Sequence, residues 1–293
     1  MPGLIGRSFR LYRDDLAPLL NKVGAVEKRP QWREALHYGV FLYILLTMSE
    51  IELELKDDAQ PSVVNDPELE IMLKAGLHFG YSRSKRHPKM KPYIFGQRNG
   101  VEVFDLEKVR DNLKDALAFI AELSGQGKNM ILVGTKVAAR GSIEKAARDL
   151  GLPYVSNRWI GGTLTNFNMI RKRIDYFENL KEDKKSGALE EKYTKKEVLR
   201  LSEKIIKLEV IFGGVASLKK LPDALFIVDP EEEITAVREA RRLSIPIIGL
   251  ASNDNNPDEV TYLIPGNDSS RASINFIIER VSEAWQKGKA NII

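Results

Sequence analysis

The sequence contains no cysteine and only three histidines, His37, His78 and His87. Without cysteine, the chain has no disulfide, no thiolate metal ligand and no cysteine nucleophile. The histidines form no HExxH pattern, so they do not predict a metal centre either. We therefore expect a protein without metal or other cofactor, and the missing disulfides fit a reducing, cytoplasmic environment.

Long hydrophobic runs are also missing. The most apolar run, Val40–Met48, has nine residues, whereas a membrane-spanning helix needs about 20. Ser49 and Glu50 follow it, where a signal peptide would need small residues for cleavage. The sequence thus predicts no membrane association and no secretion, and we expect a cytoplasmic protein.

The excess of positive over negative charge is also small, because the formal net charge is only +4. The distribution of charge is more informative than this sum. The window 73–98 contains no acid and these seven cations: Lys74, Arg83, Lys85, Arg86, Lys89, Lys91 and Arg98. Uncompensated cations this close repel one another unless a polyanion neutralises them, so the window predicts contact with nucleic-acid phosphates. A solvated basic loop is the alternative.

A second basic region covers residues 158–220, with 15 Lys/Arg against 9 Asp/Glu. Arg158 and the triplet Arg171, Lys172 and Arg173 are its candidate phosphate contacts. Charges beside a helical seam are often solvated or paired within the protein, which is the competing interpretation here. Residues 223–259 are acidic instead, with nine acids against three arginines, and we expect them to face away from RNA.

Apolar strands alternate with amphipathic helices through most of the chain, which predicts an α/β fold with a parallel sheet covered by helices on both faces. The strands are expected at 130–133, 153–155, 224–228, 246–250 and 262–264, and the helices at about 106–123, 141–150, 231–243 and 269–286. Asp105 can cap the first helix. Asn99-Gly100 predicts a tight turn between apolar stretches at 93–95 and 101–104.

Residues 163–213 interrupt this alternation with two heptad seams. The seams are Phe167, Ile170, Ile174 and Phe177, then Val198, Leu201, Ile205, Leu208 and Phe212. They predict an antiparallel coiled-coil hairpin inserted into an α/β domain formed by 69–162 and 214–288. We expect Trp159 to pack at the hairpin base, and Gly161-Gly162 to allow close approach of either RNA or the sheet.

Residues 1–68 differ from the rest and form an N-terminal extension. Residues 48–70 are acidic and contain Pro61 and Pro67, which is typical of a disordered leader. Two interpretations of 1–47 remain open. Either Met48 is the true start, or the segment is a real extension with a docking helix around 31–47.

Catalytic motifs are weak. Val133–Lys136 follows a strand and precedes a helix, so its amides could bind phosphate. It lacks the GxxxxGK[ST] spacing of a P-loop, and no GxGxxG occurs. Glu231–Glu233 more simply stabilise the N-terminus of the next helix. We predict no catalytic residue, and keep a cytosolic phosphate- or nucleotide-binding enzyme as the alternative.

Several segments resemble bacterial small-subunit ribosomal protein two, in the order found in that family. They are 73–80 (LKAGLHFG), 87–96 (HPKMKPYIFG), 131–136 (ILVGTK), 157–167 (NRWIGGTLTNF), 221–230 (LPDALFIVDP) and 264–268 (IPGND). The resemblance implies a Rossmann- or flavodoxin-like domain with a protruding hairpin, and a structural role in translation without catalysis or a small-molecule substrate. It also implies binding to small-subunit ribosomal RNA at the head–body junction, next to neighbouring subunit proteins, and a docking role for ribosomal protein one in recruiting messenger RNA.

The candidate RNA-binding residues combine the basic regions with these motifs. They are Arg83, Lys85, Arg86, Lys89, Lys91, Arg98, Lys136, Arg158, Arg171, Lys172 and Arg173. The sequence departs from the family pattern at Arg86, where many members have tryptophan, and at Ser252–Pro257, where many read DTNCDP. Any stacking by that tryptophan is lost here while a charge is gained, and the contacts of the 252–257 loop do not carry over directly.

Overall fold

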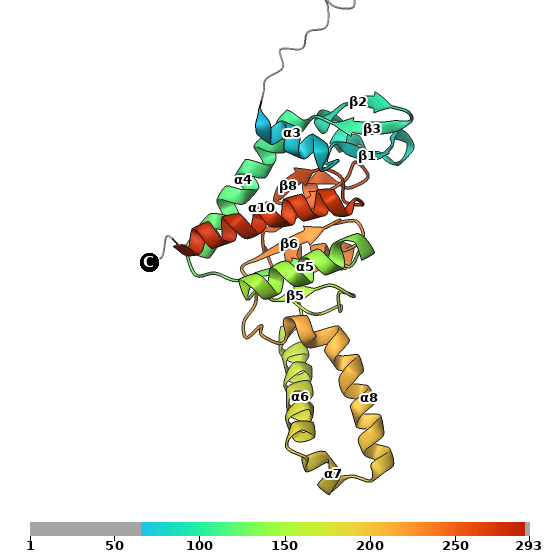
Figure 1. The fold of residues 1–293 in the computed structure, drawn as a ribbon, viewed down its shortest axis with the longest axis vertical. Coiled ribbons are helices and arrows are strands. Elements are labelled where there is room, and N and C mark those ends of the chain that lie inside the picture. The colour runs from blue at the N-terminus through green and yellow to red at the C-terminus, as the bar shows by residue number, and fades with distance from the viewer. Residues whose placement is uncertain (1–65, 291–293) are drawn as a thin grey trace, which may run out of the picture. The chain divides into compact units, whose positions relative to one another are not determined.

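The computed structural model describes residues 66–290 (Figure 1). The predictions for 1–47 and for the acidic stretch before Asp66 lie outside these residues. The helices are α3 (Pro67–Lys74), α4 (Leu106–Gly125), α5 (Val137–Leu150), α6 (Phe167–Lys185), α7 (Ala188–Lys192), α8 (Lys195–Phe212), α9 (Ile234–Arg242) and α10 (Arg271–Ala290). The strands are β1 (Phe79–Ser82), β2 (Ile94–Arg98), β3 (Val101–Phe104), β4 (Met130–Val133), β5 (Tyr154–Val155), β6 (Ala224–Val228), β7 (Ile247–Ala251) and β8 (Tyr262–Pro265). Four short 3-10 helices complete the list: η2 (Arg83–Lys85), η3 (Pro88–Tyr93), η4 (Gly213–Val215) and η5 (Pro257–Glu259).

The central sheet is parallel throughout, in the order β5-β4-β6-β7-β8. Its middle strands are buried on both faces because successive side chains point to opposite sides. In β6, Phe226 and Val228 pack into one core cluster with α4, α5 and α10. Leu225 and Ile227 pack into a second cluster with α9 and the hairpin base. The predicted α/β class with helices on both faces is confirmed.

A small antiparallel sheet, in the order β1-β3-β2, adjoins the parallel sheet. The β2–β3 hairpin turns at Asn99 and Gly100, whose φ angles are 51° and 81°. Both residues therefore occupy the left-handed region that the Asn-Gly sequence predicts. Strand β1 was not predicted, because it gains its partner only from β3, about 20 residues later in the chain.

The inserted hairpin consists of α6 and α8, with the short α7 between them (Figure 1). Ile170, Ile174 and Phe177 on α6 are buried, as are Ile205 and Phe212 on α8, in agreement with the two predicted seams. At the base, Gly214 lies against the backbone of Tyr154, where an added Cβ would stand 2.3 Å from the carbonyl oxygen. Any larger residue would push the hairpin away from the edge strand β5.

Helix α3 was not predicted from the sequence. It begins at Pro67, with the side chain of Asp66 accepting a hydrogen bond from the Glu68 amide at 3.0 Å. Helix α5 begins at Val137 rather than near 141, and it ends as expected at Gly151. Among residues 66–290, no helix is both long enough and apolar enough to cross a bilayer.

Candidate nucleic-acid interface

Four predicted RNA-binding cations are exposed beside the small sheet. Arg83 and Lys85 lie on η2, Lys91 lies on η3, and Arg98 ends β2. Within the described part of the chain, none of the four forms an ion pair with a carboxylate. Lys85 instead places its ammonium 4.9 Å from the centre of the Tyr81 ring. These cations keep their charge available for an external anion.

Arg86 is placed differently, because its charge is used inside the protein. Its Nη1 donates to Oε1 of Glu102 at 2.9 Å, and the Glu102 side chain is only 3% exposed. The other oxygen, Oε2, accepts from Nδ2 of Asn253 at 2.7 Å. Asn253 also bonds both backbone groups of Tyr81, through Oδ1 at 2.7 Å and Nδ2 at 3.1 Å. This network fastens the 81–87 segment to the loop after β7.

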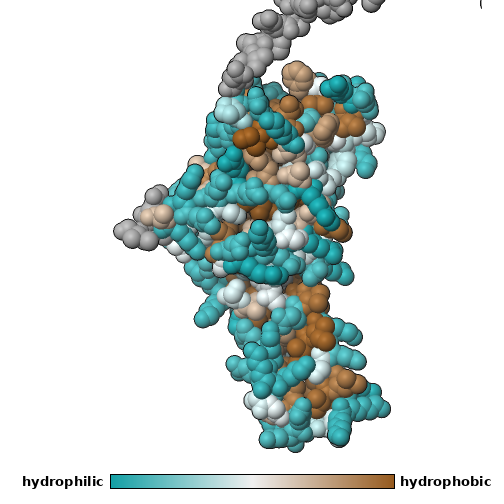
Figure 2. Space-filling view, in the orientation of Figure 1, coloured by the Kyte–Doolittle hydropathy of each residue, from teal (hydrophilic) through white to brown (hydrophobic). Residues whose placement is uncertain are grey.

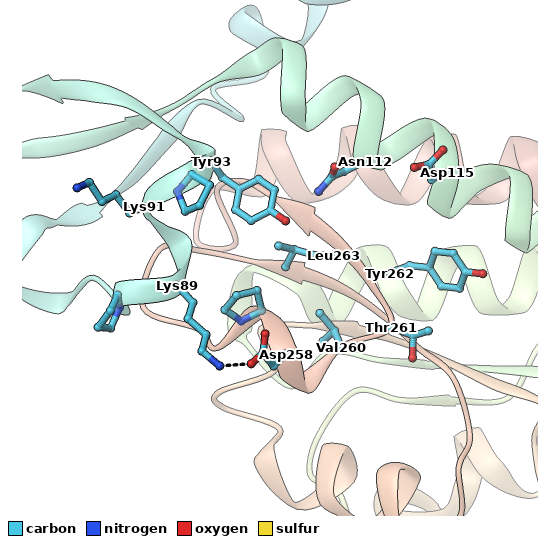
Figure 3. Close-up of a pocket in the computed structure, with 13 residues that line it drawn as sticks. Lys89, Lys91, Tyr93, Asn112, Asp115, Asp258, Val260, Thr261, Tyr262 and Leu263 are labelled. Atoms are coloured by element: carbon cyan, nitrogen blue, oxygen red, sulfur yellow. Dashed lines mark hydrogen bonds and ion pairs between the residues drawn. The ribbon is translucent and has the colours of Figure 1, made fainter.

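Lys89 also has a partner within the protein, since its ammonium pairs with the carboxylate of Asp258 (Figure 3). The pair joins η3 to η5 at the rim of an open groove of about 680 Å³. Both side chains remain more than half exposed, so water weakens this pair and its contribution to stability is small. Lys91, in contrast, points away from the pair in Figure 3.

Lys136 lies at the carboxyl end of the parallel sheet, where it neutralises two aspartates. Its Nζ is 2.5 Å from Oδ2 of Asp229 and 3.0 Å from Oδ2 of Asp268. It also donates to the Tyr81 hydroxyl at 3.3 Å, and that hydroxyl bonds Ser269 at 2.6 Å. Lys136 was predicted to contact RNA, but its side chain is only 20% exposed and its ammonium already bonds to these three groups.

The electrostatics of this cluster oppose full ionisation. Burial raises the pKa of Asp268 to about 6, and the nearby negative charge of Asp229 acts in the same direction, outweighing the pull of Lys136. Burial alone would lower the pKa of Lys136, but the carboxylates of Asp268 and Asp229 more than compensate and raise it. Lys136 therefore stays charged, and Asp268 takes up a proton below about pH 6.

The start of α5, where a phosphate could bind, is also filled by the protein itself. The amide of Thr135 donates to Oε1 of Glu233 at 3.2 Å, and Glu233 is buried. Burial raises the pKa of Glu233, although the hydrogen bonds from Thr135 act against this rise. A phosphate at this position would have to displace a carboxylate and approach Asp229, so the geometry disfavours the nucleotide-binding interpretation of Val133–Lys136.

The predicted cations of the hairpin also fall into two groups, one paired within the protein and one exposed. Arg171 donates to the carbonyls of Ala216 and Leu218 at 3.0 and 3.2 Å, and it pairs with Asp175 at 2.8 Å and Glu178 at 3.0 Å. These bonds fix the base of the hairpin. Exposed cations at the remaining predicted positions, Arg158, Lys172 and Arg173, have no ion pair within residues 66–290 and stay available to phosphates.

The 157–167 motif folds around one buried carboxylate on α9. Oε1 of Glu239 accepts from the Gly162 amide at 2.7 Å, and Oε2 accepts from the amides of Leu164 and Thr165 at 2.9 and 3.1 Å. Gly162 has a φ of 91°, which favours glycine. The Gly162 amide is thus bonded to helix α9, a partner that neither the RNA nor the sheet interpretation named, and Trp159 is buried as expected.

Sequence reasoning missed Asp229, Asp268, Glu102, Asn253 and Glu239. A signal existed for the first two, because each follows a parallel strand of the sheet and such residues meet at one edge. Both also lie inside motifs that carried the family resemblance, 221–230 and 264–268. No comparable signal marked Glu239, whose partners are about 75 residues earlier in the chain.

Together these features define a Rossmann-like α/β scaffold with an inserted helical hairpin, whose sheet edge is filled by its own charged side chains. A family described as Ribosomal protein S2 matches residues 72–288. The chain belongs to the ribosomal protein S2 family.

Similar proteins bear the name small ribosomal subunit protein uS2. The protein of Dictyoglomus thermophilum is 44% identical over 218 residues, which cover 74% of this chain and 88% of that protein. The protein of Desulforapulum autotrophicum is 42% identical over 217 residues, covering 74% and 77%. The protein of Geotalea uraniireducens is 40% identical over 217 residues, covering 74% and 84%.

Proposed function

We propose that this chain is a structural constituent of the small ribosomal subunit that binds ribosomal RNA at the head–body junction. Family membership supports the structural role. The observation that carries RNA binding is the group of exposed cations beside the small sheet: Arg83, Lys85, Lys91 and Arg98. We call these four the free cations. Release of condensed counterions by such residues drives binding to RNA without a base-sequence code.

The remaining predicted contacts have two roles in this proposal. Arg158, Lys172 and Arg173 extend the phosphate-binding surface to the hairpin. Arg86, Lys89 and Lys136 act indirectly, because their ion pairs hold the segments around the small sheet that presents the free cations. Arg171 also acts indirectly, by fixing the base of the hairpin. An RNA contact by Arg86 or Lys136 would require opening an ion pair with a buried carboxylate, at a cost in free energy that an exposed pair such as Lys89–Asp258 does not carry.

Binding of the full chain to small-subunit ribosomal RNA at increasing salt tests the proposal. In the test variant, the free cations are replaced by alanine. In a matched control, Lys114, Lys128, Lys145 and Lys287, which are exposed elsewhere on the α/β domain, are replaced instead. Both variants lose the same net charge. Each lost phosphate contact lowers the log–log salt slope by about 0.7–0.9 units, so the test variant should lose about three units and the control far fewer.

Equal losses in the two variants would mean that net charge alone governs the association. Failure of the unaltered chain to bind this RNA at low ionic strength would refute the proposal itself.

Docking of ribosomal protein one on the α/β domain is a further part of the proposal, supported by the family resemblance. Co-sedimentation of the purified chain with purified ribosomal protein one, without RNA, tests it directly. If no complex forms at micromolar concentrations, the docking part of the proposal is refuted, while the part on RNA binding is unaffected.

A further inference from the structure

Helix α8 is apolar on two faces, although the hairpin needs only one. The first face packs against α6 through buried Ile205 and Phe212. The second carries Leu199, Ile206 and Val210, which are 63%, 62% and 56% exposed. Positions 199, 206 and 210 are separated by seven and four residues, so they lie on one side of the helix. We call these three residues the outer stripe.

The outer stripe lies on an exposed side of the hairpin. Figure 2 shows apolar side chains gathered on the hairpin, among the charged residues that cover the rest of it. Single exposed aliphatic residues are common, but a row of large ones along one helix face marks an interaction site. Within residues 66–290, no other element covers the outer stripe.

Cations line one side of the outer stripe. Lys196, Arg200 and Lys207 follow along α8 next to the stripe, all three exposed and without an ion pair in the described region. Other charges of the hairpin are used internally, since Lys181 pairs with Glu209 at 2.8 Å and Lys204 donates to the Tyr176 hydroxyl at 2.9 Å. The charges that remain beside the apolar row are therefore three cations and one acid, Glu203, which lies between Leu199 and Ile206.

The stripe continues into a groove at the hairpin base. This groove has a volume of about 300 Å³ and is lined by Val210 and Ile211 together with two arginines and two glutamates, Arg148, Arg158, Glu144 and Glu209. An apolar strip and a basic border thus lie along α8, with a groove of mixed charge at one end.

We propose that the outer stripe docks an amphipathic helix of another protein, one whose apolar side chains are bordered by carboxylates. The apolar side chains of such a helix cover Leu199, Ile206 and Val210, and its carboxylates face Lys196, Arg200 and Lys207. A second copy of this chain fits poorly, because two basic borders would meet. RNA also fits poorly, because phosphates gain nothing from three aliphatic side chains. The surface lies on the hairpin, away from the free cations of the small sheet (Figure 1).

Two synthetic peptides of about 18 residues, enough to follow the whole of α8 at ~1.5 Å per residue, test the proposal on the purified full chain. Both carry leucines at helical spacing. One has glutamates beside the leucines and the other has lysines. By fluorescence anisotropy, the glutamate peptide should bind at least about tenfold more tightly, since several charge pairs of modest strength add together.

Three variants locate the binding. Ile206→Asp and Val210→Asp should each weaken binding of the glutamate peptide at least about tenfold, because a charge enters the apolar contact. Both positions are exposed, so the variants should keep the far-ultraviolet circular dichroism of the unaltered chain. Phe95→Asp, at an 82% exposed site on β2, is the matched control and should bind normally.

Other occupants give different results. Equal binding of the two peptides, or binding of neither, would overturn the proposal. A dimer of the chain that Ile206→Asp converts to monomer would assign the surface to a second copy. Displacement of the glutamate peptide by an RNA hairpin would assign it to RNA. None of these measurements uses ribosomal RNA bound at the free cations, so their outcome is independent of the proposed function.

Discussion

The indole Nε1 of Trp159 donates to Oε1 of Glu239 at 3.1 Å, which joins the hairpin base to helix α9 across 80 residues of sequence. Glu239 is 8% exposed and also receives three backbone amides from 162–165. Burial would raise the pKa of this carboxyl, but the amides of Thr165, Gly162 and Leu164 prevail and hold the pKa below its usual range. The carboxylate is therefore the centre around which the 157–167 motif folds.

Replacing this carboxylate should destabilise the protein strongly. Glu239→Ala leaves several buried donors without a partner, and we expect a loss of about 3 kcal/mol in the free energy of unfolding. Urea unfolding at neutral pH measures the loss. Because the folded pKa is depressed, the stabilisation is present above the unfolded pKa and disappears as pH falls through the folded value. Glu232→Gln, at an exposed site nearby, is the control, and an equal effect there would refute the assignment.

Lys136 should be needed for stability. Lys136→Met leaves Asp229 and Asp268 close together without a cation, at an expected cost of about 3–5 kcal/mol near neutral pH. Acid should relieve part of this cost, because Asp268 then becomes neutral. The exposed Lys145 on α5 gives a control, Lys145→Met. A variant at Lys136 with normal stability but weakened RNA binding would show that this lysine contacts phosphate after all.

The raised pKa of Asp268 predicts an unusual pH dependence. Between about pH 4 and pH 6 the folded state holds a proton that the unfolded state has released, so this group makes the protein less stable as pH rises through the window. A shift from 3.8 to about 6 corresponds to about 3 kcal/mol.

Asp268→Asn should remove this decline. Urea unfolding at a series of pH values compares it with Asp149→Asn, a change at an exposed site on α5. A decline that persists in Asp268→Asn would have to come from another group.

Alanine variants of Arg86 and Lys91 should distinguish a cation paired within the protein from an exposed one. Arg86→Ala leaves the carboxylate of Glu102 buried without its cation, and we expect a loss of about 3 kcal/mol in the free energy of unfolding. Lys91→Ala should leave stability within about 0.5 kcal/mol and reduce the salt slope of RNA binding by somewhat less than one unit. Calorimetry and RNA titration measure both. Equal stability losses would contradict the assigned roles.

Periodicity was sufficient to predict the parallel strands and the hairpin. The strands at 130–133 and 224–228 are continuous apolar runs because both faces are covered, and the seams of α6 and α8 repeat at heptad spacing because the helices pack on each other. Such patterns depend on neighbours in sequence and on burial, so they can be recognised without coordinates.

Partners of the charged side chains could not be predicted in the same way. Arg83 and Arg86 are three residues apart in one basic window, yet only Arg86 reaches a carboxylate, and Lys136 meets aspartates about 90 and 130 residues later. The sequence by itself determined the α/β class, the inserted hairpin and the concentration of positive charge. Only the tertiary structure decided which cations stay free, because ion pairing depends on distances of 3–4 Å between segments that the fold brings together.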